Sequence, residues 1–212
     1  MNIFRLTGDM MHLASILILL LKIHTSHSCA GISFKTQVLY LTVFLTRYLD
    51  LFTNFTSVYL TCMKIFFIAS SAYIIYLMRF PFKDTYNKHL DAFRWEFLLG
   101  GAAVLALVFP QKYTVREVFW TYSIFLEMLA ILPQLFQLQR TGEAATITTH
   151  YLFALGAYRA LYIANWIYRY QMGEHVDGVA VLAGIVQTAL YCDFFYIYFT
   201  RVLRGQRFKL PV

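Results

Sequence analysis

One stretch of this sequence, residues 148–170, restricts the possible fold more than any other. It is apolar and long enough to cross a bilayer as one helix, because some twenty residues at about 1.5 Å each span the roughly 30 Å hydrocarbon core. It nevertheless carries Arg159, Asn165 and Arg169. An arginine at mid-depth costs about 2.5–3.5 kcal/mol on insertion scales, so these side chains should face partner helices or a water-filled cavity. The stretch therefore predicts one helix of a membrane protein with a polar interior.

The polar side chains of this stretch are regularly spaced. Steps of three and four residues place Asn165 and Arg169 on one stripe of a helix, together with three aromatic side chains. The stripe consists of Tyr158, Tyr162, Asn165, Trp166 and Arg169. Lipid does not satisfy such a surface, and we interpret it as one wall of a binding cavity.

Composition agrees with a membrane protein, since 59% of the 212 residues are hydrophobic and only 14% are charged. Short polar connections separate the apolar segments and leave no room for an extramembrane domain. We therefore predict a single transmembrane domain over residues 1–212, ending in a short basic cytosolic tail at 201–212. The seven predicted spans are roughly 4–22, 36–54, 58–78, 95–110, 116–138, 148–170 and 178–200.

These spans predict an all-α fold with an internal plan. Three spans, one linking span and three further spans suggest two three-helix bundles joined by a linking helix, which is a known transporter plan. Pro133 lies inside the fifth span and should kink or loosen it, because proline lacks a backbone donor and clashes with the preceding turn.

Basic residues are distributed unevenly between the two faces of the predicted bundle. One face, with the C-terminal tail, collects Lys22, Lys35, Arg79, Lys83, Lys88, Arg94, Arg140, Arg201, Arg204, Arg207 and Lys209. By the positive-inside rule that face is cytosolic, and the N-terminus is lumenal or extracellular. An alternative interpretation makes the first segment a cleaved signal peptide, which would discard Asp9 and His12.

Charged residues recur in several of the predicted spans. For a single pair, such as Arg47 and Asp50 on one face of the second span, the simpler interpretation is an ion pair that holds the bundle together. The whole set favours a ligand site, because guanidinium groups bind carboxylates in bidentate geometry and the arginines are in excess. These arginines are Arg5, Arg47, Arg159 and Arg169.

The remaining polar groups refine the expected ligand. Trp120 and Trp166 offer stacking surfaces for an aliphatic or cationic chain. Asp50 and Glu117 offer a place for one positive charge. A short acidic peptide with a free C-terminus fits this description.

His12 lies in the first predicted span, where it is either a neutral hydrogen-bonded imidazole or a pH switch. Histidine has a reference pKa of about 6.5, so its charge changes between mildly acidic and neutral compartments. Protonation beside a carboxylate-binding cavity would raise the affinity for an anion. Glu127 and Tyr158 are candidates for a hydrogen bond coupled to that event.

Several other classes of protein find no support in the sequence. The net charge of +7 is not gathered into a basic cluster with stacking residues, which argues against nucleic-acid binding. No nucleophile with an adjacent base and no metal-ligand spacing is evident, so we expect neither an enzyme nor a cofactor. Cys29, Cys62 and Cys192 are an odd number and imply no disulfide framework.

Several longer runs of the sequence carry a family resemblance. These runs are MNIFRLTGD at the start, CAGIS at 29–33, TRYLDLFTNF at 46–55, LEMLAILPQLF at 126–136, TGEAATITTHYLFALGAYRALY at 141–162 and YCDFFYIY at 191–198. The sequence is similar, over essentially its whole length, to the KDEL receptor family of ER lumen protein-retaining receptors. The resemblance implies seven transmembrane helices in a fold similar to SWEET and PQ-loop transporters.

The resemblance also implies a function and a partner for each side of the membrane. Such receptors bind the C-terminal signal K-D-E-L, or a variant such as H-D-E-L, of escaped ER-resident proteins in the acidic Golgi. They return with it in COPI-coated vesicles and release it at the higher pH of the ER.

Individual residues receive roles from the same resemblance. Arg5, Arg47 and Arg169 resemble the carboxylate-binding set, and His12 resembles the pH sensor, with Glu127 and Tyr158 as its relay. Asp50, Glu117 and Trp166 resemble the surroundings of the first signal residue, Asn54 lies near a position linked to signal variants, and Asp193 matches a position needed for retrograde transport. The full predicted ligand-binding set is Arg5, Arg47, Tyr48, Asp50, Asn54, Glu117, Trp120, Arg159, Tyr162, Trp166 and Arg169.

The tail departs from the family pattern. Relatives end in clustered lysines that resemble a COPI-binding signal, whereas this chain has Arg204, Arg207 and Lys209. Arginine and lysine are not interchangeable at specific contacts, so coat binding is less securely implied than ligand binding. From the residues alone, a small-solute transporter of the SWEET or PQ-loop type is the alternative function. The arginine excess and His12 favour an anionic peptide over a neutral sugar.

Overall fold

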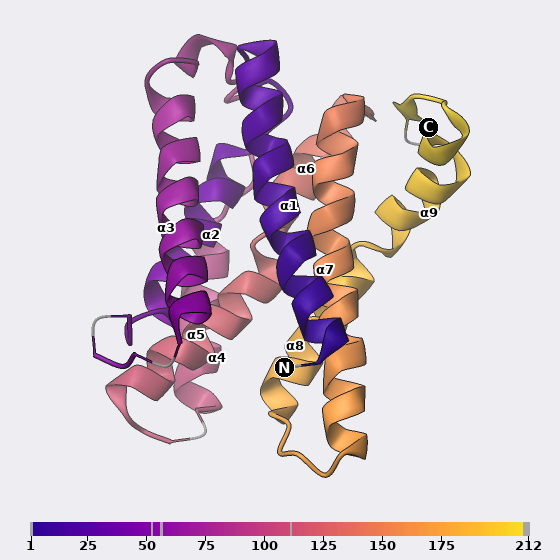
Figure 1. Cartoon of the computed structure of the whole chain (residues 1–212). Coiled ribbons are helices and arrows are strands. Elements are labelled where there is room, and N and C mark those ends of the chain that lie inside the picture. Colours follow the sequence, from indigo (N-terminus) through magenta and orange to yellow (C-terminus); the bar gives the residue numbers. More distant parts are fainter. Residues whose placement is uncertain (1, 52, 56, 111, 210–212) are drawn as a thin grey trace. The chain divides into compact units, whose positions relative to one another are not determined.

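The computed structural model describes residues 2–51, 53–55, 57–110 and 112–209, most of which are helical (Figure 1). The α-helices are α1 (Ile3–Ser26), α2 (Phe34–Arg47), α3 (Val58–Arg79), α4 (Glu96–Val108), α5 (Val115–Leu129), α6 (Leu132–Thr141), α7 (Thr146–Gln171), α8 (Gly178–Leu190) and α9 (Cys192–Thr200). Two 3-10 turns, η1 (Lys83–Thr85) and η2 (Val202–Arg204), and two short strands, β1 (Glu143–Ala144) and β2 (Phe208–Lys209), complete the described elements.

Several helices have the length and apolar character of membrane spans. Ile3–Ser26, Val58–Arg79 and the run Val115–Thr141 each qualify alone, and α8 and α9 qualify together across a 45° bend. The protein is therefore an all-α membrane protein, as the sequence predicts.

The other predicted spans are helical but do not combine the length and the apolar character of a membrane span. α7 has 26 residues, which is ample length, but its polar stripe lowers its hydropathy. α2 and α4 have 14 and 13 residues and are short for a roughly 30 Å core. The arrangement into seven spans thus stays a prediction.

Three helix boundaries interrupt predicted spans. α5 ends at Leu129 and α6 begins at Leu132, so the interruption lies just before Pro133, where the missing backbone donor predicts it. The second predicted span, 36–54, ends as a helix at Arg47, because the chain turns there: the Asn54 N–H donates to the Asp50 carbonyl at 2.9 Å. The last span breaks at Tyr191, which ends α8 and precedes α9.

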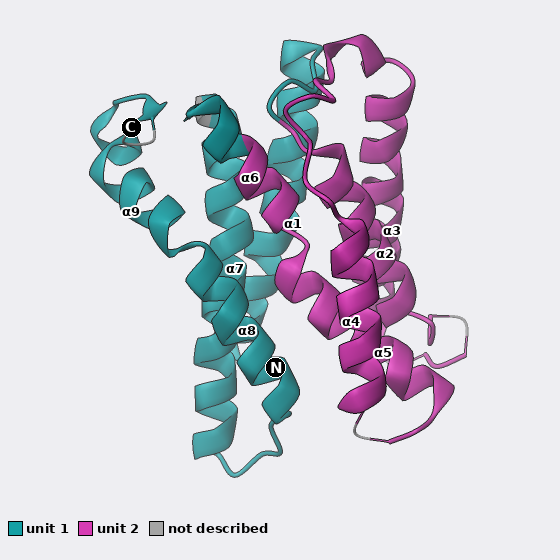
Figure 2. Cartoon of the chain, turned by 180° about the vertical axis from the view of Figure 1, so that it is seen from behind, with its two compact units in different colours: residues 1–31, 138–212 teal, residues 32–137 magenta. Residues whose placement is uncertain are grey.

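The chain forms two compact units, residues 1–31 with 138–212 and residues 32–137 (Figure 2). In the first unit α1 packs along α7, which also contacts α8 and α9. Ile16, Leu19 and Ile23 recur at steps of three and four on α1 and are buried. In the second unit α2 packs against α3 and α5, and α4 packs against α5.

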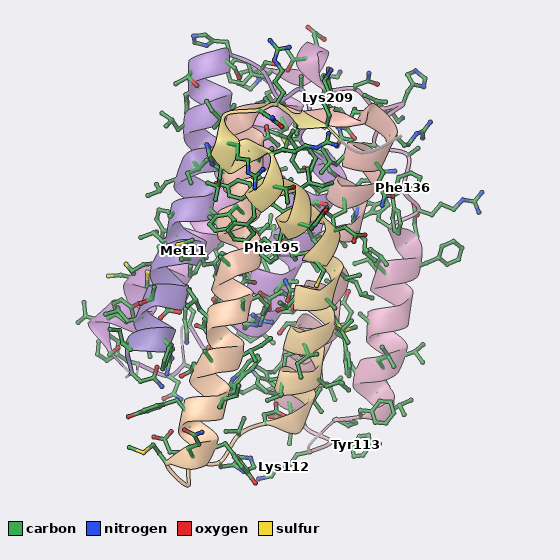
Figure 3. All side chains as sticks on the ribbon, turned by 90° about the vertical axis from the view of Figure 1, so that its right-hand side faces the viewer. Met11, Lys112, Tyr113, Phe136, Phe195 and Lys209 are labelled. Atoms are coloured by element: carbon green, nitrogen blue, oxygen red, sulfur yellow. The ribbon has the colours of Figure 1, made fainter. Side chains whose placement is uncertain are left out.

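The C-terminal tail of the first unit folds back on itself. β2 pairs antiparallel with β1, with Lys209 opposite Glu143, and the Arg201 Nη1 donates to the Lys209 carbonyl at 2.9 Å. Phe208 is 2% exposed and stacks on Phe194 with ring centroids 5.3 Å apart. Figure 3 shows Lys209 at the end of this folded segment. The basic side chains of the tail are thus presented from an ordered turn.

The second unit contains a buried carboxylate that ties the loop after α3 to the start of α2. Asp91 is 1% exposed and accepts from the Ser33 hydroxyl at 2.9 Å, the Lys35 backbone N–H at 3.2 Å and the Tyr86 hydroxyl at 2.7 Å. A carboxylate is favourable there, because the first backbone N–H groups of a helix lack intrahelical partners. Burial and the hydrogen bond to Asp91 raise the pKa of Tyr86 well above its usual range, so the phenol remains a donor at physiological pH.

Candidate ligand-binding site

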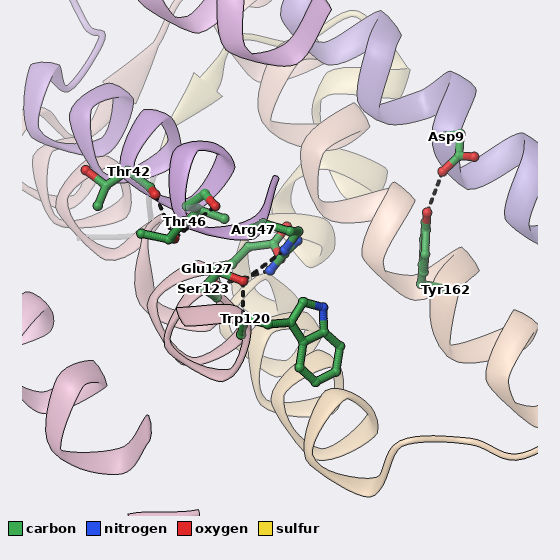
Figure 4. A network of polar contacts seen from close by, with 9 residues as sticks. Asp9, Thr42, Thr46, Arg47, Trp120, Ser123, Glu127 and Tyr162 are labelled. Carbon is green, nitrogen blue, oxygen red and sulfur yellow. Dashed lines mark hydrogen bonds and ion pairs between the residues drawn. The ribbon is translucent and has the colours of Figure 1, made fainter. Parts of the chain in front are cut away.

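The pairing of α1 with α7 is fixed by polar contacts near the start of α1. Asn2 caps α1 by accepting from the Arg5 backbone N–H at 2.9 Å, and its amide donates to Asn165 at 2.8 Å. The Tyr162 hydroxyl donates to the Asp9 carboxylate through a short hydrogen bond (Figure 4). Asn165 was predicted on the polar stripe of α7, whereas Asn2 and Asp9 were not predicted as ligand-site residues, although an acidic residue inside an apolar helix is itself a signal.

His12 and Tyr158 lie face to face between the same two helices. Their ring centroids are 4.2 Å apart with the planes inclined by 5°, and both side chains are buried. The Arg159 guanidinium carbon lies 5.1 Å from the Tyr158 ring centroid. A proton added to His12 would therefore place a charge against an aromatic face beside an arginine.

Trp166 is held by α8 in the same unit. Its ring lies edge-on to Tyr162, with centroids 6.0 Å apart and an interplanar angle of 68°. Gly184 of α8 faces it, and a Cβ atom at that position would lie 2.5 and 2.8 Å from two Trp166 ring atoms. The glycine thus sets the position of the indole.

The contact between Gly184 and Trp166 predicts that alanine substitutions at two glycines change stability differently. Gly184→Ala should leave the free energy of unfolding unchanged or up to about 3 kcal/mol lower, because the new methyl group displaces Trp166. Gly100→Ala in α4 is the matched control: nothing lies within 4 Å of its Cβ position, so the helix should gain about 0.5–1 kcal/mol. Thermal unfolding in detergent measures both, and equal effects at the two positions would contradict the assigned contact.

Arg169 ends the polar stripe of α7 and is already paired. Its Nε donates to the Glu174 carboxylate at 2.6 Å, and its Nη2 donates to the His175 carbonyl at 3.1 Å. Arg5, His12, Tyr158, Arg159, Tyr162, Trp166 and Arg169 thus all lie on α1 and α7 of one unit.

The second unit has its own charged centre around Arg47, at the end of α2. The Arg47 Nη1 lies 2.5 Å from the Glu127 carboxylate of α5, and its Nε and Nη2 donate to the hydroxyl and the carbonyl of Ser123 at 3.1 Å each (Figure 4). The Ser123 hydroxyl in turn donates to the Trp120 carbonyl at 2.6 Å. The predicted pair of Arg47 with Asp50 is therefore replaced by Arg47 with Glu127.

Asp50 pairs with a residue that sequence reasoning missed. The Lys64 ammonium of α3 donates to both Asp50 oxygens, at 2.9 and 3.0 Å, and Arg116 lies 3.5 Å from one of them. The ammonium also lies 5.7 Å from the Tyr48 ring centroid. Asp50 is thus paired with cations of the chain itself, and its role toward a positive charge of the ligand stays a prediction. The sequence signal for Lys64 was a lysine standing alone in an apolar helix, where a charge needs a partner.

The remaining predicted residues are placed as follows. Asn54 is exposed in the turn before α3, Glu117 is half-buried in the first turn of α5, and Asp193 is exposed in the first turn of α9. Glu127 and Tyr158 belong to different units, so their predicted relay stays a prediction. Among the described residues, Cys29, Cys62 and Cys192 are free cysteines, and none of the His, Cys, Asp and Glu groupings is suited to a metal ion.

Apolar helices of membrane length that carry paired arginines and carboxylates define the class: an integral membrane protein with charged side chains among its helices. The profile of one family, ER lumen protein retaining receptor, matches residues 28–169. The chain is 58% identical to the ER lumen protein-retaining receptor of Drosophila melanogaster over 211 residues, covering 100% of both proteins. It is 57% and 56% identical to ER lumen protein-retaining receptor 2 of Gallus gallus and Danio rerio over the same extent. The chain belongs to the ER lumen protein retaining receptor family.

Proposed function

We propose that this protein retains ER-resident proteins by binding their C-terminal signal, K-D-E-L or a variant such as H-D-E-L, inside the membrane. The observation that carries the proposal is the α1–α7 pair, on which Arg5, His12, Arg159 and Arg169 all lie, in a chain similar to retaining receptors along its whole length. The protein acts as a receptor without catalysis and needs no cofactor.

The charged and aromatic residues of the predicted set suit the parts of such a signal. Guanidinium groups bind the terminal and side-chain carboxylates of the peptide, since arginine is suited to bidentate recognition of carboxylates. Asp50 and Glu117 receive the positive charge of its first residue, with Trp120 and Trp166 as stacking surfaces. Tyr48, Asn54 and Tyr162 complete the proposed ligand-binding set.

The site works within a membrane cycle. The protein has seven spans in a SWEET-like plan, with the N-terminus lumenal and the C-terminus cytosolic. It cycles between Golgi and ER, and the COPI coat binds the tail through Arg204, Arg207 and Lys209, with Asp193 required for transport. The folded turn that ends in Lys209 presents these residues.

Binding should depend on pH through His12. Protonated His12 adds a positive charge beside the bound carboxylates, so the complex takes up a proton. The affinity is therefore high at acidic pH and falls as the pH rises, by at most about tenfold per pH unit for one proton. Stacking on Tyr158, 4.2 Å away, couples that charge to α7.

This pH dependence gives a direct test. A labelled peptide ending in K-D-E-L should bind purified protein more tightly at about pH 5.5 than at about pH 7.4, and His12→Asn should flatten the difference. His89→Gln, at an exposed loop position, is the control and should keep the wild-type ratio. An unchanged ratio in His12→Asn would remove His12 from the mechanism. Solute uptake in proteoliposomes, without peptide binding, would favour the transporter alternative.

A further inference from the structure

We propose that Glu174 is an internal competitor of the ligand: its carboxylate occupies Arg169 and lowers the affinity for the peptide. This inference rests on the proposed function, because it concerns how strongly that same site binds a carboxylate. The geometry around the end of α7 supports it in three steps.

First, the backbone delivers Glu174 to Arg169. Gly173 follows the helix with φ of +73°, and the Glu174 N–H donates to the Arg169 carbonyl at 3.0 Å. This bond and the left-handed glycine define a Schellman motif, in which the side chain two positions after the helix end lies against one in the last turn. Apolar side chains usually meet there, whereas here an arginine meets a glutamate.

Second, the contact uses the part of Arg169 that recognises carboxylates. A guanidinium binds a carboxylate through two parallel N–H groups of one edge. On the Nε–Nη2 edge of Arg169, Nε donates to Glu174 at 2.6 Å and Nη2 donates to the His175 carbonyl at 3.1 Å. A peptide carboxylate that approaches this edge must displace both acceptors.

Third, the pair is accessible, so its strength is modest and it can exchange. The Arg169 and Glu174 side chains are 36% and 56% exposed. Exposed ion pairs contribute about 0.2–1 kcal/mol, which corresponds to a difference of up to about fivefold in affinity.

The experiment compares three variants in peptide titrations at both pH values. Glu174→Gln removes the charge and keeps an acceptor for Nε, whereas Glu174→Ala removes both. Asp177→Asn is the matched control: it removes a charge from the same loop, and asparagine preserves the cap that Asp177 gives to the Val179 N–H at 2.9 Å. We expect both Glu174 variants to bind about two- to fivefold more tightly at either pH, and Asp177→Asn to bind like the wild type.

Three results would overturn the proposal. Weaker binding by Glu174→Ala would show that Glu174 positions Arg169 for the ligand. An equal gain in Asp177→Asn would assign the effect to general loop charge, and unchanged affinity in both Glu174 variants would mean that no competition exists.

A second measurement needs no peptide and separates this inference from the proposed function. Phenylglyoxal modifies accessible guanidinium groups, and mass spectrometry measures its rate at Arg169. We expect the rate to rise at least about twofold in both Glu174 variants, because an exposed pair of this strength is broken, and to stay unchanged in Asp177→Asn. An unchanged rate would refute the pairing. A faster rate in a protein that binds no peptide would uphold the pairing and refute the receptor function.

Discussion

Replacing Arg47 by leucine should lower the free energy of unfolding by about 3–5 kcal/mol, the cost of breaking a buried ion pair by removing one partner. The Glu127 side chain is only 2% exposed and the Arg47 side chain 20%, so the carboxylate keeps its desolvation cost and loses the guanidinium that neutralises it. Ser123 loses at the same time the two hydrogen bonds that its hydroxyl and carbonyl oxygens accept from Arg47. Denaturant unfolding in detergent measures the change.

Two further variants locate the cause of that loss. Arg47→Leu combined with Glu127→Leu should recover most of the stability, because replacing both charges with apolar groups removes the buried carboxylate that Arg47 no longer neutralises. Arg116→Leu is the control, since its side chain is 66% exposed and its pair with Asp50 spans 3.5 Å; it should cost at most about 1 kcal/mol. A double variant no more stable than Arg47→Leu would contradict this account.

Asp91→Ala is the second large effect, with an expected loss of about 3 kcal/mol or more. The carboxylate is 1% exposed and accepts from Ser33, Lys35 and Tyr86, so its removal leaves three donors without this acceptor. Each buried donor left unsatisfied costs about 1–3 kcal/mol, although water entering the gap recovers part of that. The start of α2 should become more accessible, which hydrogen exchange of the Lys35 amide detects.

Asp84→Ala is the control for the Asp91 variant. Asp84 lies in the same loop, within η1, and is exposed, so its removal should change stability by less than about 0.5 kcal/mol. Equal losses at the two positions would show that the loop charge, and not the three hydrogen bonds of Asp91, supports α2.

The sequence was sufficient for the class of fold. Apolar length and composition predicted an all-α membrane protein, and α1, α3 and the run Val115–Thr141 confirm it as apolar helices of membrane length. The boundaries were harder, because hydropathy does not reveal where a backbone turns. The turn after Arg47 shows this: residues up to Asn54 remain apolar enough to read as a span, yet the helix has ended.

The site was predicted by residue type but not by partner. Arg47 was expected to be important, yet spacing along one helix suggested Asp50 as its partner, whereas the structure pairs it with Glu127 on α5. Lys64 escaped notice because it stands alone in its helix, and Glu174 because its contact with Arg169 depends on the left-handed turn at Gly173. Contacts between elements distant in sequence depend on packing, which a single sequence does not display.

The central claim is that this chain recognises a free C-terminal carboxylate through its intramembrane arginines. The most direct test titrates purified protein at about pH 5.5 with two labelled peptides ending in K-D-E-L, one with a free carboxyl terminus and one amidated. The account predicts tight binding of the free peptide and loss of at least about 2 kcal/mol with the amide, since a charge-assisted bidentate contact disappears. Equal affinity for the two peptides, or binding of neither, would contradict it.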